Sequence, residues 1–142
     1  MHRRPIGRGR TLGIVSAIVM LVGCVLPWYA IGGGSDLPMR QLNAFSGSGI
    51  LVFIAALATL AVVALPYAAG DRPVGADRWP AYLIFALAAW VGLSYWVITL
   101  LGDTAPGLLP NRAPGLWIAA AGTVALSRAV YDIANEQEPG LR

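Results

Sequence analysis

The sequence predicts an all-α integral membrane protein: a four-helix bundle in one domain, residues 1–142, with both termini on the cytoplasmic side. Composition is the first observation. Hydrophobic residues make up 57% of the chain and charged residues only 12%, whereas soluble domains hold roughly 45–50% and about 25%. The second observation is four stretches without any charged residue, at 11–35, 41–70, 79–102 and 113–127. Because a membrane-spanning helix needs about 20 mostly apolar residues, these stretches predict four spans.

The first span is expected near residues 11–30, where a second interpretation also has to be weighed. Residues 21–24 read LVGC and fit a lipobox, at which a bacterial signal peptide is cut before a cysteine that is then acylated. The apolar run, however, continues past Cys24 to Ile31, whereas a lipoprotein usually turns polar after that cysteine. We therefore expect Cys24 to be a small apolar residue in an uncleaved helix.

A glycine-rich segment connects the first span to the second, which is expected near residues 48–68. Residues 28–31 and 39–45 flank the glycines and predict a short β-hairpin in this first outer loop. An irregular loop on the membrane surface is an equally compatible alternative. The glycine run at 32–34 lacks a strand–helix context and a following lysine, so it does not indicate a phosphate-binding loop.

The third and fourth spans are expected near residues 80–101 and 114–133. Pro114 suits the first turn of a helix. The fourth span is interrupted by Arg128, which lies four residues before Asp132 and can pair with it on one helix face. The arginine stem can also extend to the lipid headgroups. An interfacial helix or a half-span is the alternative for this segment.

The distribution of arginines predicts the orientation. With both termini inside, the cytoplasmic segments hold eight arginines, and the outer segments hold only Arg40 and Arg112. Cytoplasmic loops of membrane proteins carry an excess of Arg and Lys, which favours this orientation. The chain has no lysine and is rich in alanine, as is typical of GC-rich bacterial genomes. The expected location is thus a bacterial plasma membrane.

Aromatic and small residues predict how the spans meet lipid and one another. Aromatic side chains gather at membrane interfaces, whereas small residues allow close contact between helices. We expect Trp90 to pack within the bundle. The predicted interface anchors are Trp28, Tyr29, Trp79, Tyr82, Trp96 and Tyr131. The predicted helix-packing residues are Gly13, Ala17, Ala88, Gly92, Gly115, Ala119 and Thr123.

Residues that carry chemistry are sparse. A single cysteine, Cys24, excludes a disulfide-exchange enzyme, and the only histidine, His2, precedes the first span and leaves no intramembrane haem ligand. The acidic residues are scattered, and the pairs Asp71–Arg72 and Asp77–Arg78 fit solvated ion pairs in a loop. No span holds an ionisable residue before Arg128, which disfavours an ion-coupled carrier. We expect no catalytic residue, metal, cofactor or nucleic-acid partner.

The chain resembles the small four-span membrane proteins of unknown function that are common in actinobacteria and related bacteria. The resemblance rests on LPWYAI at the end of the first span, NAFSGSGILVFIAALATLAVVAL across the second and APGLWIAAAGTVALSRAV in the fourth. It covers about residues 10–135. It implies the four-span topology, but it supplies no activity and no functional residues.

Two functions remain open from the sequence. The favoured one is a non-enzymatic subunit, accessory or structural, that sits in the bilayer and docks onto a larger membrane complex or onto copies of itself. The alternative is a channel or carrier for a small neutral or hydrophobic solute. Its lining would come from hydroxyl residues, although such groups commonly bond to the backbone of their own helix. The candidate lining residues are Ser16, Thr59, Ser94, Thr99 and Thr123.

Overall fold

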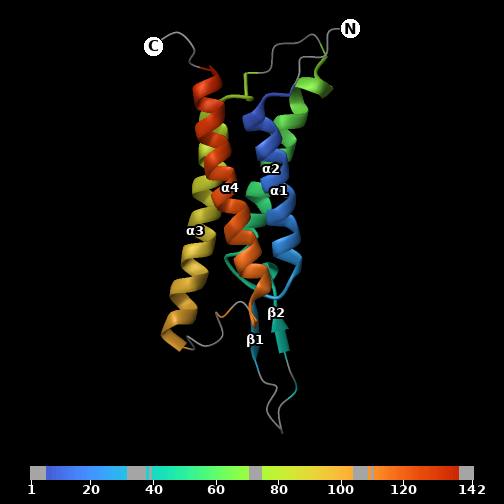
Figure 1. Ribbon diagram of the computed structural model, residues 1–142. Coiled ribbons are helices and arrows are strands. Elements are labelled where there is room, and N and C mark those ends of the chain that lie inside the picture. Colours follow the sequence, from blue (N-terminus) through green and yellow to red (C-terminus); the bar gives the residue numbers. More distant parts are fainter. Residues whose placement is uncertain are drawn as a thin grey trace.

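The computed structural model describes residues 6–31, 38, 40–70, 75–103, 109 and 111–137. Its secondary structure consists of four long helices, a small hairpin and one short 3₁₀ helix (Figure 1). The long helices are α1 (Arg8–Val25), α2 (Ile50–Ala68), α3 (Trp79–Asp103) and α4 (Pro114–Gln137). The shorter elements are β1 (Tyr29–Ile31), β2 (Arg40–Leu42) and η1 (Ala44–Ser46). The glycine run at 32–34 and the pair Asp71–Arg72 lie outside the described residues.

All four long helices are apolar and long enough to cross a membrane. The candidate spans are Arg8–Val25, Ile50–Ala68, Trp79–Leu101 and Pro114–Glu136. This finding confirms the four predicted spans, and the fourth is long enough for a full crossing rather than a half-span. Four such helices indicate a multi-pass membrane protein whose outer surface contacts lipid.

The helices pack as a bundle in which each contacts its two neighbours. The α1 helix packs against α2 and α4, and α3 packs against the same two helices from the other side. The start of α1, the end of α2, the start of α3 and the end of α4 lie together at one end, which we call the terminal end (Figure 1). The hairpin of β1 and β2 lies at the opposite end, which we call the hairpin end. Successive helices therefore run in alternating directions, as short connections require.

The predicted β-hairpin in the first loop is confirmed. Strands β1 and β2 are antiparallel, with Tyr29 opposite Leu42 and Ile31 opposite Arg40. The backbone N–H of Trp28 extends the pairing by donating to the carbonyl of Leu42 at 2.8 Å. The hairpin thus begins at the point where α1 stops.

The first helix ends at Val25, a few residues before the expected end of the span near residue 30, because Pro27 stops it. Leu26 caps the helix in an extended conformation, with φ −74° and ψ 159°. The residue before a proline is sterically biased away from the helical region, which explains this break. At the end of α2 the chain turns instead through Gly70, whose φ of +62° lies in the left-handed region that favours glycine.

Candidate functional site

The most polar part of the described structure is a hydrogen-bonded cluster at the terminal end. We call it the Arg10 network; its members are Arg10, Asp77, Tyr82 and Glu136. The Nε of Arg10 donates to both carboxylate oxygens of Asp77, at 3.2 and 2.9 Å, and Nη2 of Arg10 lies 2.8 Å from Oδ2. The Tyr82 hydroxyl donates to Oδ1 of Asp77 at 2.7 Å. The carboxylate of Asp77 therefore connects α1 to the first turn of α3.

Glu136 connects the end of α4 to the start of α1 within this network. Its Oε1 accepts the backbone N–H of Gly9 at 3.1 Å, and its Oε2 lies 4.0 Å from Nη1 of Arg10. The residue that caps α1, Gly7, offers no side chain to the free N–H groups of the first turn. A carboxylate is favourable there because the amide groups give the start of a helix a partial positive charge. Glu136 thus caps α1 from a different helix.

Within the Arg10 network, the pair Arg10–Asp77 and Tyr82 are largely shielded from solvent, whereas Glu136 is exposed. The side chains of Arg10 and Asp77 are 23% and 11% exposed. The expectation that Asp77 belongs to a solvated loop ion pair was therefore wrong: its carboxylate is largely buried against α1 and Tyr82. No local pattern links residues 10 and 77, so the sequence offered no signal for this contact.

Two tryptophans form the centre of the hairpin end. The rings of Trp28 and Trp96 meet edge to face, with centroids 5.5 Å apart and an interplanar angle of 87°. The indole N–H of Trp28 donates to the carbonyl of Gly23 at 2.8 Å. The indole nitrogen of Trp96 is buried and has no hydrogen-bond partner among the described residues. This pair joins the short segment between α1 and β1 to α3.

The predicted interface anchors lie close to the ends of the helices, but they face different surroundings. Trp28, Tyr82 and Trp96 are buried within the bundle, which removes them from contact with lipid. Tyr29 and Trp79 are half-buried, and Tyr131 is exposed. For the exposed and half-buried residues, the role of interface anchor stays a prediction.

Trp90 does not lie inside the bundle, where we expected it. It is 40% exposed, and its indole N–H donates to the hydroxyl of Ser127 at 3.0 Å. The bond joins α3 to α4 at their outer edge. The expectation of burial was wrong because a tryptophan in mid-span can satisfy its N–H from a neighbouring helix while its ring faces outward.

Small residues bring α1 and α4 into backbone contact. A Cβ atom added to Gly23 would lie 2.5 Å from the backbone nitrogen of the predicted packing residue Ala119, and one added to Gly115 would lie 2.5 Å from the carbonyl oxygen of Leu26. Gly122 was not among the predicted packing residues, but a Cβ added there would lie 2.9 Å from the backbone nitrogen of Met20. Such close approach is the usual mode of helix association in membranes.

The other predicted packing residues differ in how closely they are packed. Ala17 and Thr123 are fully buried, and Ala88 is half-buried. A Cβ on Gly92 would lie 2.8 Å from the carbonyl oxygen of Ser48, which places α3 directly against the start of α2. A Cβ on Gly13 would make only ordinary contact, 3.9 Å from Thr59.

Four of the five candidate lining residues bond to the backbone of their own helices, and the fifth, Ser94, is exposed on α3. Ser16 donates to the carbonyl of Gly13. The three threonines make equivalent bonds: Thr59 to Ala55, Thr99 to Tyr95 and Trp96, and Thr123 to Ala119. Hydroxyls used in this way do not form a polar path through the bundle.

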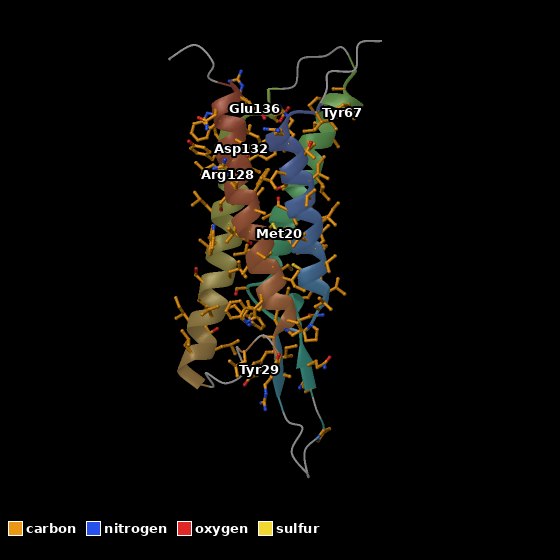
Figure 2. The ribbon with its side chains drawn as sticks, viewed as in Figure 1. Met20, Tyr29, Tyr67, Arg128, Asp132 and Glu136 are labelled. Atoms are coloured by element: carbon orange, nitrogen blue, oxygen red, sulfur yellow. The ribbon has the colours of Figure 1, made fainter. Side chains whose placement is uncertain are left out.

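Arg128 pairs with Asp132, as predicted from their spacing. The Nη2 of Arg128 lies 3.2 Å from Oδ1 of Asp132, one turn further along α4. The guanidinium carbon lies 5.1 Å from the ring centre of Tyr131, within the range of a cation–π contact. Figure 2 shows Arg128 and Asp132 along α4, followed by Glu136 at the terminal end.

The polar and aromatic side chains of the bundle can hold helices together and position charges. Within the described ranges, no three His, Cys, Asp or Glu side chains come close enough to hold a metal ion. The thiol of Cys24 is free and buried in α1. No known protein-family model matches the chain, and no curated protein is significantly similar to it.

Proposed function

We propose that this chain is a non-enzymatic accessory or structural subunit, either of a larger membrane complex or of a homo-oligomer. The observation that carries this proposal is the use of buried polar groups within the fold itself. Among the described residues, the buried serine and threonines are Ser16, Thr59 and Thr123, and each bonds to its own helix. The Arg10 network also bonds internally. With its interior occupied in this way, the bundle offers its outer surface for function.

The outer surface offers a continuous apolar face for association within the bilayer. Along α3, large apolar side chains recur at helical spacing and point away from the bundle. These are Ile84, Leu87, Val91, Tyr95 and Ile98, each between 55% and 68% exposed. A subunit role requires that part of this face contact another protein instead of lipid.

Extraction in a mild detergent followed by mass measurement tests this proposal. We expect particles whose protein mass is a multiple of the 14.9 kDa chain or includes a second protein in fixed ratio. Measurement over a tenfold range of detergent separates specific association from shared micelles. A strictly monomeric particle without any partner would contradict the proposal.

We further propose that both termini face the cytoplasm of a bacterial plasma membrane, as in the small four-span proteins that the chain resembles. In this orientation the cytoplasmic segments of the sequence hold eight arginines and five acidic residues, whereas the outer segments hold two of each. The net charge of +3 therefore falls on the cytoplasmic segments. An excess of arginine marks the cytoplasmic side.

The packing of α1 supports its retention in the mature protein. Its buried face is in backbone contact with α4 at Gly23, and Glu136 caps its first turn. Cleavage before Cys24 would remove most of this helix and expose the small residues of α4. We expect the intact mass of the membrane-extracted protein to include residues 1–23. A mass lowered by that segment and raised by acyl chains would show lipobox processing instead.

A further inference from the structure

Arg128 is a cation that the bundle does not use internally. Its side chain is 64% exposed, whereas its neighbours Ala129 and Ile133 are fully buried against the bundle. The acidic partner Asp132 is only 26% exposed. The outward-facing member of this ion pair is therefore the cation.

The position of Arg128 along α4 places it below the headgroups. The preceding charged residue is Arg112, which is exposed in the loop before α4. The 15 uncharged residues between them, at 113–127, span only about 22 Å as a helix, against about 30 Å of hydrocarbon. A charged side chain in the hydrocarbon is costly and is usually paired. Asp132 supplies one anion for this charge, and the exposed part of the guanidinium is free to meet a second anion at the membrane surface.

The geometry of Arg128 leaves room for that anion. A guanidinium has five N–H donors, and the contact with Asp132 engages Nη2. The carboxylate of Asp132 and the ring of Tyr131 both contact the guanidinium and hold it in place. The remaining donors can form the paired hydrogen bonds that a phosphate accepts.

We propose that Arg128, steadied by Asp132 and Tyr131, binds the phosphate of an anionic phospholipid in the leaflet at the terminal end. The choice of an anionic lipid follows from charge, because the excess of arginine lies at this end and basic residues beside a membrane attract anionic headgroups. Arg8 and Arg78 are both exposed there and add to the attraction. The lipid contacts α4 near the edge that faces α3, where Ser127 holds Trp90.

Native mass spectrometry of the full chain in detergent tests this site by titration with phosphatidylglycerol and, separately, with phosphatidylcholine. We expect tighter binding of phosphatidylglycerol and about a tenfold loss of its affinity in Arg128→Gln. The matched control is Arg112→Gln, which removes an exposed arginine at the hairpin end and should leave the affinity unchanged. Arg128→Lys should retain part of it, because charge remains without the paired donors.

Three results would overturn the proposal. The first is equal affinity of phosphatidylglycerol for Arg128→Gln and the unchanged protein, with both folded by circular dichroism. The second is full displacement of the lipid by inorganic phosphate at equal concentration, since a free anion would then be the ligand. The third is a change of particle mass in Arg128→Gln without a change in lipid affinity, which would mark a protein interface.

Discussion

Arg10 and Asp77 stabilise the terminal end as a pair because both side chains are largely buried. Replacing one partner leaves the other in a poorly solvated position without its hydrogen bonds, which costs about 1–3 kcal/mol. We expect Arg10→Gln and Asp77→Asn each to lower the free energy of unfolding by about that amount. The double variant should lose clearly less than the sum, because residues in one network are not additive.

Unfolding of these variants can be measured by titrating sodium dodecyl sulfate into mixed micelles and following the helical circular dichroism. Tyr82→Phe provides an internal comparison, since it removes only the hydroxyl that donates to Asp77. Its loss should be about 1 kcal/mol. Strictly additive losses for Arg10→Gln and Asp77→Asn would show that the pair contributes no coupling.

Trp28 and Trp96 allow the contribution of one buried hydrogen bond to be separated from ring packing. Both are buried and touch edge to face, but only Trp28 has an acceptor for its indole N–H among the described residues. Replacement by Phe removes a similar volume at each site. We expect Trp28→Phe to lower the free energy of unfolding by about 1 kcal/mol more than Trp96→Phe does. Equal losses in the same titration would argue against the bond to Gly23.

The contact between α1 and α4 depends on the absence of side chains at particular glycines. A methyl group on Gly23 would press on the backbone of Ala119, which cannot yield as a flexible side chain can. We expect Gly23→Ala to destabilise the bundle by about 1–3 kcal/mol. Gly13→Ala on the same helix is the matched control, because a Cβ there makes ordinary contact. It should be neutral or stabilise by up to about 1 kcal/mol through helix propensity.

The two variants are best compared by thermal unfolding in the same detergent. Gly23→Ala should unfold at a lower temperature than the unchanged protein, and Gly13→Ala at the same or a higher temperature. If both variants shifted equally, then α1 would not pack on α4 through the backbone contact at Gly23.

The four long helices could be predicted from the sequence because hydrocarbon thickness requires apolar stretches of a fixed length. The hairpin after α1 followed from its glycines and flanking residues. The end of α1 was missed because the break depends on one proline, Pro27, inside an otherwise apolar run. Glycine spacing alone did not distinguish Gly23, which touches α4, from Gly13, which does not crowd its neighbour.

The polar contacts of the candidate site were predictable only where they were local. Arg128 and Asp132 are one turn apart on a helix, so their spacing predicted the pair. Asp77 meets Arg10 only when three helices have packed, and no single-sequence pattern encodes that meeting. An aromatic residue near a helix end also looks the same in sequence whether it is exposed on the outer surface, as Tyr131 is, or buried, as Trp28 is.

For the molecule as a whole, the two ends of the bundle differ in kind. The terminal end joins α1, α3 and α4 through the Arg10 network, and Arg8, Arg78 and Arg128 are exposed there. The hairpin end is closed by apolar packing around Trp28 and Trp96. This difference underlies the proposed orientation, in which the terminal end faces the cytoplasm. The proposed orientation also requires that the bilayer separate the two ends.

Labelling of single cysteines in intact cells tests that separation most directly. In a Cys24→Ala background, Ser46→Cys reports on the hairpin end and Ala76→Cys on the terminal end, since both residues are exposed. A membrane-impermeant maleimide should label Ser46→Cys in intact bacterial cells and should label Ala76→Cys only after permeabilisation. The reverse pattern would contradict the orientation, and labelling of both from outside would contradict a bundle that crosses the membrane four times.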